Sequence, residues 1–83
     1  MNGTAIKVLY FARVADLTRI RQESWPLSHA LSGTDWLREL EGRYPQLAPT
    51  GRLKLAVNQY HVDHQSLIQP GDEVAVFEPV TGG

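Results

Sequence analysis

The strongest constraint on the fold of this chain is a single amphipathic helix placed between β-rich segments. Residues 35–44 are expected to form this helix, with Thr34 as its N-cap and Pro45 ending it. Charged side chains occupy one side of the segment, and apolar side chains recur on the other side at Trp36, Leu37, Leu40 and Tyr44. Because 83 residues leave room for only one core, the β-rich segments must pack against this stripe.

The β-rich segments predict one mixed sheet. Residues 6–11 are largely apolar on both faces, as in a central strand, whereas Pro26 places the segment 21–27 at a sheet edge. The other predicted elements are a short helical turn at 12–17, a hairpin of 53–57 and 60–62 around Asn58 and Gln59, and a strand at 73–77 after the turn Pro70-Gly71-Asp72. This order predicts an α+β fold, a single β-grasp domain over residues 1–83, with the first and last strands parallel at the centre of the sheet.

The last six residues, 78–83, are expected to form an extended tail beyond the final strand. Pro79 fixes its own φ and cannot donate to a sheet ladder, so it ends the strand and directs the chain outward. Gly82 and Gly83 lack Cβ atoms and can thread where side chains would clash. Six extended residues span about 20 Å. The α-carboxylate of Gly83 can therefore enter a partner's active site while the domain stays outside.

The composition of the chain excludes several classes of function. Cysteine is absent, which rules out disulfides and a cysteine nucleophile, so sulfur chemistry would need external sulfur. The net charge of -1, without blocks of like charge, argues against nucleic-acid and membrane partners. No segment has the length of a membrane span or the layout of a signal peptide. We expect a cytoplasmic protein whose partners are proteins.

Four segments of the chain together resemble one family. They are the opening Ile6-Lys7-Val8-Leu9-Tyr10-Phe11-Ala12, the run Ala56-Val57-Asn58-Gln59, the turn Pro70-Gly71-Asp72-Glu73-Val74 and the ending Pro79-Val80-Thr81-Gly82-Gly83. These segments are similar to the small subunit of molybdopterin synthase, the MoaD-type sulfur carrier with a ubiquitin-like fold. The resemblance extends over nearly the whole chain. One departure is Glu78, which stands where an apolar residue or proline is common.

The resemblance implies a sulfur-donating subunit that is consumed and regenerated and has no catalytic activity alone. In this family a ubiquitin-activating-like adenylyltransferase uses ATP to adenylate the terminal glycine, here Gly83. A sulfurtransferase supplies the sulfur that makes it a thiocarboxylate, which donates sulfur to a cyclic pyranopterin precursor in the large catalytic subunit. Assemblies of two small and two large subunits are typical. No bound cofactor or metal is implied, and the tail residues that contact the partner would be Pro79, Val80, Thr81 and Gly82.

The face of the sheet opposite the helix is expected to contact a partner. Strand parity directs one set of side chains toward the helix, namely Ile6, Val8, Tyr10, Leu55, Val57, Val74 and Val76. Parity leaves Phe11, His61 and Phe77 on the other face. Large apolar side chains on an uncovered face suggest a partner surface, and Phe77 adjoins the tail.

The sequence leaves three other functions open. These are a thiazole-pathway sulfur carrier, which also ends in Gly-Gly, a ubiquitin-like modifier joined to lysines, and an adaptor with an inert tail. A zinc site at His61 and His64 is disfavoured, because the two have opposite strand parity and no further ligand completes it. A catalytic triad is disfavoured because Ser24 lacks the context of a nucleophile elbow; its other members would be His29 and Asp35.

Overall fold

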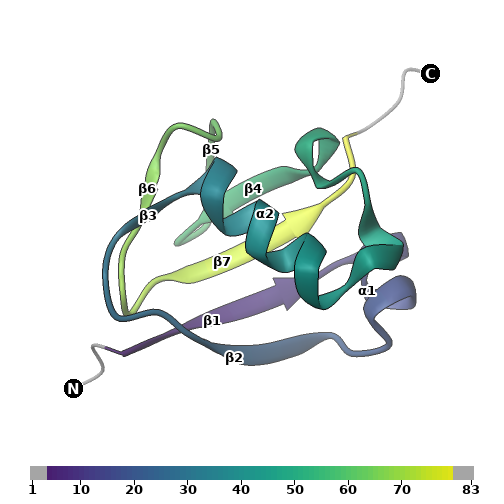
Figure 1. The fold of residues 1–83 in the computed structure, drawn as a ribbon, viewed down its shortest axis with the longest axis horizontal. Coiled ribbons are helices and arrows are strands. Elements are labelled where there is room, and N and C mark those ends of the chain that lie inside the picture. Colours follow the sequence, from purple (N-terminus) through teal and green to yellow (C-terminus); the bar gives the residue numbers. More distant parts are fainter. Residues whose placement is uncertain (1–3, 80–83) are drawn as a thin grey trace.

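The computed structural model describes residues 4–79. Five strands of these residues form one sheet in the order β2-β1-β7-β4-β5, and two short strands, β3 and β6, form a second sheet. Figure 1 shows α2 lying across the larger sheet. The elements in chain order are β1 (Ala5–Tyr10), α1 (Ala12–Thr18), β2 (Gln22–Pro26), β3 (Leu31–Ser32), α2 (Gly33–Arg43), η1 (Pro45–Leu47), η2 (Thr50–Arg52), β4 (Lys54–Val57), β5 (Tyr60–Val62), β6 (Leu67–Ile68) and β7 (Glu73–Phe77).

The centre of the sheet is the parallel pair of β1 and β7, as the sequence predicted. Val8 lies opposite Val74 in this pair, and β4 continues the sheet antiparallel to β7. The edge strand β2 is antiparallel to β1 and ends at Pro26, where a missing N–H group is tolerated. Because β1 and β7 run in the same direction, both strands end on the same side of the domain. The chain therefore leaves β7 beside the start of α1 (Figure 1).

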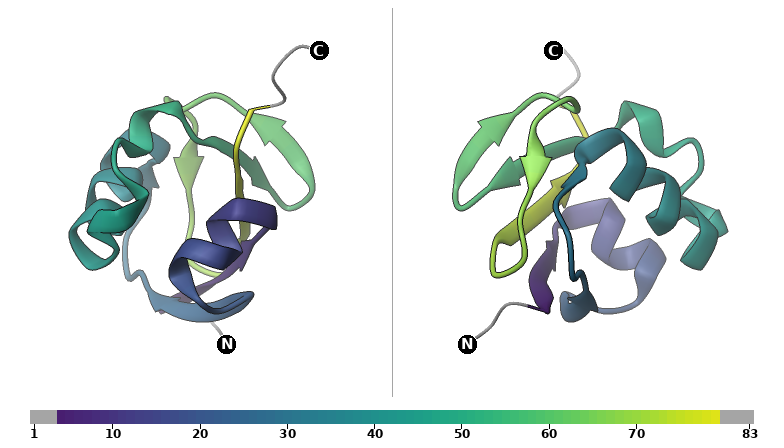
Figure 2. Two further views of the ribbon diagram at one scale, coloured as in Figure 1. Left: turned by 90° about the vertical axis from the view of Figure 1, so that its right-hand side faces the viewer. Right: turned by 60° about the vertical axis from the view of Figure 1, so that its left-hand side comes forward.

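The core lies between α2 and one face of the sheet, and Figure 2 shows α2 against that face in two further directions. Trp36 and Leu40 are fully buried and Tyr44 is half-buried, which confirms the predicted apolar stripe. Trp25 of β2 packs edge-on against Trp36, with ring centroids 5.5 Å apart. The strand residues predicted to face the helix are all buried, or partly buried in the case of Val57: Ile6, Val8, Tyr10, Leu55, Val57, Val74 and Val76.

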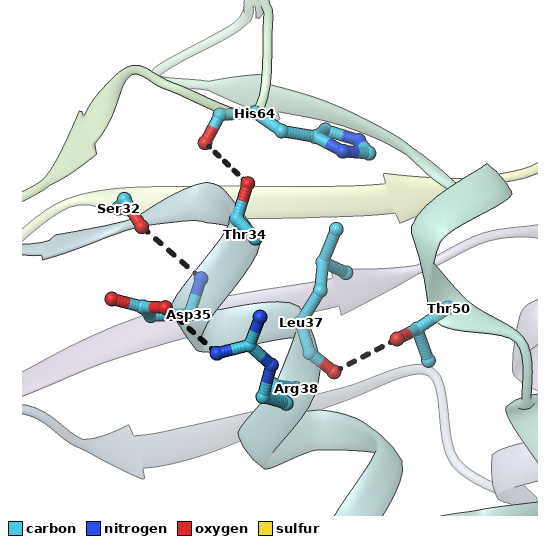
Figure 3. Close-up of polar contacts among 7 residues, drawn as sticks. All are labelled: Ser32, Thr34, Asp35, Leu37, Arg38, Thr50 and His64. Carbon is cyan, nitrogen blue, oxygen red and sulfur yellow. Dashed lines mark hydrogen bonds and ion pairs between the residues drawn. The ribbon is translucent and has the colours of Figure 1, made fainter.

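The start of α2 differs from the prediction. Its N-cap is Ser32 and not Thr34, since the Ser32 hydroxyl accepts a hydrogen bond from the Asp35 amide at 3.1 Å. The Thr34 hydroxyl instead donates to the carbonyl oxygen of His64 at 3.2 Å (Figure 3). The segment before α2 contains the short strand β3, for which the sequence offered no prediction, and β3 pairs with β6. The pairing of β3 with β6 places the chain around His64 next to the start of α2. The Thr34 hydroxyl therefore bonds to a distant residue and does not cap the helix.

Gly33 is the position where α2 leaves no space for a side chain. A Cβ atom there would lie 2.8 Å from Leu55 Cδ1 and 3.1 Å from the carbonyl oxygen of His64. We expect Gly33→Ala to lower the free energy of unfolding by about 1–3 kcal/mol through overpacking. Gly42→Ala is the matched control on the same helix, because nothing lies within 4 Å of its Cβ. It should stabilise the domain by about 0.5–1 kcal/mol. Urea denaturation of both variants measures this, and equal stability of Gly33→Ala and wild type would contradict the packing argument.

The carboxylate of Glu23, on β2, connects the sheet to the end of α2. Its Oε2 accepts hydrogen bonds from the hydroxyls of Tyr10 at 2.5 Å and Tyr44 at 2.7 Å. Its Oε1 accepts a hydrogen bond from Arg43 Nη1 at 3.0 Å. The Arg43 guanidinium also lies over the Trp25 ring, 4.1 Å from its centroid. Burial, followed by the hydrogen bond to Glu23, raises the pKa of both tyrosines above the ordinary value.

The raised pKa of Tyr10 predicts a loss of stability in alkali. In the unfolded chain this tyrosine loses its proton near pH 10, whereas the folded domain keeps the proton. The folded state then binds more protons than the unfolded state, so the free energy of unfolding falls by up to about 1.4 kcal/mol per pH unit from this residue. Denaturant titrations from about pH 8 to about pH 11 should show a steeper fall for wild type than for Tyr10→Phe. Parallel curves would contradict the prediction.

Candidate functional site

The candidate site is the end of the sheet where β1 and β7 terminate. The sequence predicted eight residues for this site. Half of them, Phe11, His61, Phe77 and Pro79, lie within the described residues. The other predicted positions lie outside the described residues: Val80, Thr81, Gly82 and Gly83. The geometry of the site is therefore that of the surface from which the tail departs.

His61 and Phe77 lie together on the face of the sheet that α2 does not cover. Their ring centroids are 5.2 Å apart and their planes are tilted by 47°. The register explains the contact, because Ala56 of β4 lies opposite His61 on one side and Ala75 on the other. Two small side chains thus leave space for the two rings above them. Strand parity predicted this face for both residues.

Phe11 extends the same surface past the end of β1. Tyr10 lies opposite Val76 in the parallel pair, and the Phe11 amide donates to the Val76 carbonyl at 3.3 Å. The next residues along the two strands, Phe11 and Phe77, are therefore neighbours in register. Phe11 is 49% exposed. We refer to Phe11, His61 and Phe77 as the aromatic patch.

A hollow of about 440 Å³ connects the aromatic patch to the base of the tail. Its walls combine aromatic and aliphatic groups with a lysine and an aspartate: Lys54, Leu55, His61, Val62, Asp63, Phe77 and Pro79. Protein interfaces commonly have such an apolar centre with charged groups at its border. The hollow can thus receive an apolar side chain of a partner beside the point where the tail departs.

Two arginines hold Glu78, the residue that follows β7. Glu78 Oε2 lies 2.9 Å from Arg52 Nη2 of η2 and 3.6 Å from Arg13 Nε of α1. In the sequence, Glu78 stood out only as a departure from the family pattern, and nothing pointed to the two arginines. The three residues belong to three separate elements, so no local spacing in the sequence indicates that they meet.

The two histidines that raised the question of a metal site have different surroundings. His64 Nε2 lies 2.7 Å from the carbonyl oxygen of Leu53, next to the start of α2, while His61 contacts Phe77. Among residues 4–79, no group of three or more His, Cys, Asp or Glu side chains is arranged to hold a metal ion. The third histidine, His29, was a member of the disfavoured triad, and its Nδ1 lies 3.0 Å from Oγ of the neighbouring Ser28.

None of the helices within residues 4–79 has the length and apolarity required to cross a membrane.

The helix α2 across a mixed sheet, with the parallel pair of β1 and β7 at the centre of that sheet, defines a ubiquitin-like β-grasp domain. A Pyrococcus furiosus protein assigned as molybdopterin converting factor subunit 1 has this fold with a TM-score of 0.80 and 28% identity, covering 93% of this chain and 99% of that one. Small archaeal modifier protein 1 from Haloferax volcanii matches with a TM-score of 0.77 and 23% identity, covering 94% and 100% of the two chains. The second likeness concerns the fold alone.

The chain belongs to the ThiS family, whose model matches residues 8–83. A curated relative, the molybdopterin synthase sulfur carrier subunit of Homo sapiens, is 37% identical over 82 residues, covering 94% of this chain and 93% of that protein. The resemblance drawn from the sequence segments is thereby confirmed, as is the β-grasp fold.

Proposed function

We propose that this chain is a sulfur carrier whose Gly83 carboxylate is activated, loaded with sulfur and used in molybdopterin synthesis. The observation that carries the proposal is the ThiS family match, which runs to residue 83 and so includes the glycine pair. Support also comes from the sulfur carrier subunits that are similar to this chain over nearly their whole length. The position of the aromatic patch at the base of the tail is consistent with it.

The chemistry requires an oxygen of the Gly83 carboxylate to become a leaving group. A carboxylate oxygen attacks the α-phosphate of ATP, which forms an acyl-adenylate and releases pyrophosphate. Sulfide then adds to the acyl carbon and AMP departs, which leaves a thiocarboxylate and a proton. In the second stage the thiocarboxylate sulfur attacks an electrophilic carbon of the pyranopterin precursor, a carbon–oxygen bond at that carbon breaks, and the departing oxygen takes up a proton. Water cleaves the acyl–sulfur bond, so the sulfur stays on the pterin and the Gly83 carboxylate is regenerated.

We assign the binding of ATP to an activating adenylyltransferase and not to this chain. The glycines within residues 4–79 are too widely spaced for a phosphate-binding loop: Gly33, Gly42, Gly51 and Gly71. A sulfurtransferase would deliver the sulfur, and a large catalytic subunit would hold the pterin. The chain itself contributes the reacting carboxylate and the surface that docks it.

We assign the aromatic patch to the large subunit, in an assembly of two small and two large subunits. Phe77 lies next to Glu78 and Pro79, so a partner that grips this ring also holds the base of the tail. Aromatic side chains that lose their water near the centre of an interface frequently carry much of its binding energy. A tail that is held at its base loses less freedom when it threads, because part of its ordering is supplied by the docked domain.

Intact-mass spectrometry after incubation with ATP, the adenylyltransferase and sulfide tests the proposal. Replacement of one oxygen by sulfur, located on Gly83 by fragmentation, is the expected result. Adducts joined through lysine side chains of other proteins would instead indicate a protein modifier, and an unchanged mass would indicate an inert adaptor. Transfer of the loaded sulfur to a pyranopterin and not to a thiazole precursor separates the two classes of sulfur carrier.

A further inference from the structure

We propose that Arg13, Arg52 and Glu78 form a clamp that sets the direction in which the chain leaves β7. The clamp would present Gly83 to a partner's active site with part of the tail's path already fixed. This inference rests on the proposed function of the tail. Glu78 is the first residue after β7, and residues 79–83 follow it in the sequence.

The clamp and the aromatic patch act on opposite faces of the sheet. Phe77 lies opposite Lys54 in register and packs against His61 on the face that α2 leaves open. Side chains alternate along a strand, so the residue after Phe77 is directed to the face that carries the helix. There Glu78 meets the two guanidinium groups. The base of the tail is therefore held from both faces at consecutive residues.

Both arginines extend from positions that the core fixes. Arg13 precedes Val14 of α1, whose side chain is fully buried. Arg52 ends η2, which is attached to α2 because the Thr50 hydroxyl donates to the Leu37 carbonyl at 3.0 Å (Figure 3). The two guanidinium groups thus approach one carboxylate oxygen from two separately anchored elements. This arrangement limits the direction of the carboxylate more than one ion pair can.

The clamp is suited to directing the chain and contributes little to folding. The side chains of Arg13 and Arg52 are 67% and 44% exposed, and ion pairs that are this exposed add little stability. The clamp can still direct the chain, because the ion pairs of the Glu78 carboxylate restrict the backbone at Glu78 and the ring of the next residue, Pro79, fixes its own φ angle. Two consecutive restrictions define the path of the chain as it leaves the sheet. If the start of the tail is already ordered in the free domain, binding to a partner does not have to supply the free energy of ordering it.

Kinetics of adenylation distinguish a positioning role from a structural one. Pyrophosphate release by the adenylyltransferase should show KM for Glu78→Gln and for Arg52→Gln raised about three-fold at low salt, with kcat unchanged. At about 1 M salt, where charges are screened within about 3 Å, the variants and wild type should converge. Arg38→Gln is the matched control, because it breaks an exposed 3.3 Å pair with Asp35 within α2 that shares no residue with the clamp. It should leave KM unchanged.

Amide relaxation by NMR tests the clamp without any partner. The order parameter of the residue 78 amide should fall from about 0.85 toward about 0.6 in both Glu78→Gln and Arg52→Gln, and it should stay high in Arg38→Gln. Wild-type KM at low salt together with a wild-type order parameter in both clamp variants would overturn the inference and leave the proposed function intact. Absence of adenylation in wild type would instead refute the proposed function, and the order parameter would then decide on its own whether the clamp orders the tail base.

Discussion

One alanine appended after Gly83 should lower the rate of adenylation by about 100-fold or more. The addition moves the carboxylate about 3.5 Å further along an extended chain and places a methyl group at the terminus. Attack on the α-phosphate of ATP requires the carboxylate oxygen at a defined position in the enzyme, and an error near 1 Å can cost about 100-fold. Pyrophosphate release at equal concentrations of extended and wild-type chain measures the loss.

Two controls distinguish the effect of moving the carboxylate from the effects of an added side chain and of a destabilised fold. Gly82→Ala keeps the carboxylate in place along the sequence but adds a Cβ, so it should slow activation less than the extension does. Both variants should melt as wild type does, because the core lies within residues 4–79. A normal rate for the extended chain, with an intact mass that shows no trimming, would mean that the terminal carboxylate is not the reacting group.

Phe77→Ala should weaken binding of the large subunit by about 2 kcal/mol, which is about 30-fold in Kd. The ring contacts His61 and lines the hollow beside Pro79. Truncation therefore removes an apolar group from the centre of the proposed interface. The fold should persist, because this side chain lies on the open face and is not part of the buried core. Isothermal titration calorimetry with the large subunit gives the Kd.

Leu67→Ala is the matched control for the patch. Leu67 is a large apolar residue that is 56% exposed, more than the partly buried Phe77, but it lies on β6, outside the five-stranded sheet. Its truncation should leave the Kd unchanged. If Phe77→Ala binds as tightly as wild type while its circular dichroism is native, the assignment of the aromatic patch to the large subunit is wrong.

The parts of the fold that follow from local chemistry were predictable from the sequence. The hairpin at Asn58 and Gln59 needs left-handed backbone at both positions, and the structure has φ of 51° and 74° there. Gly71 supplies the left-handed conformation before β7, with φ of 95°. Pro26 marked the edge strand because it cannot donate to a ladder. In each case a single residue type determines the outcome with little help from distant contacts.

The parts that depend on tertiary contacts were not predictable. Thr34 is a residue type that often caps helices, yet its hydroxyl donates a hydrogen bond to the carbonyl of His64, and Ser32 caps the helix instead. No local feature of the sequence at residues 31–32 indicated β3, because its partner β6 lies far along the chain. At both places the local preference of the sequence is overridden by contacts with residues 64–68, which only the folded chain brings close.

The candidate site divides in the same way. Strand parity assigned His61 and Phe77 to the open face, which the contact between their rings confirms. The position of Phe11 beside Phe77 follows only from the parallel register of β1 and β7. The arginines around Glu78 come from α1 and η2, so the cluster appears only once both elements are placed.

The most direct test of the sulfur-carrier function is a single-turnover transfer of labelled sulfur. The chain is loaded with radiolabelled sulfide, freed of excess label, and mixed with the large subunit and the pyranopterin precursor. We predict that the label leaves Gly83 and appears in the pterin in equal amount, while the chain returns to its unmodified mass. Label that stays on the chain, or equal product from a chain extended by one alanine, would contradict the function proposed here.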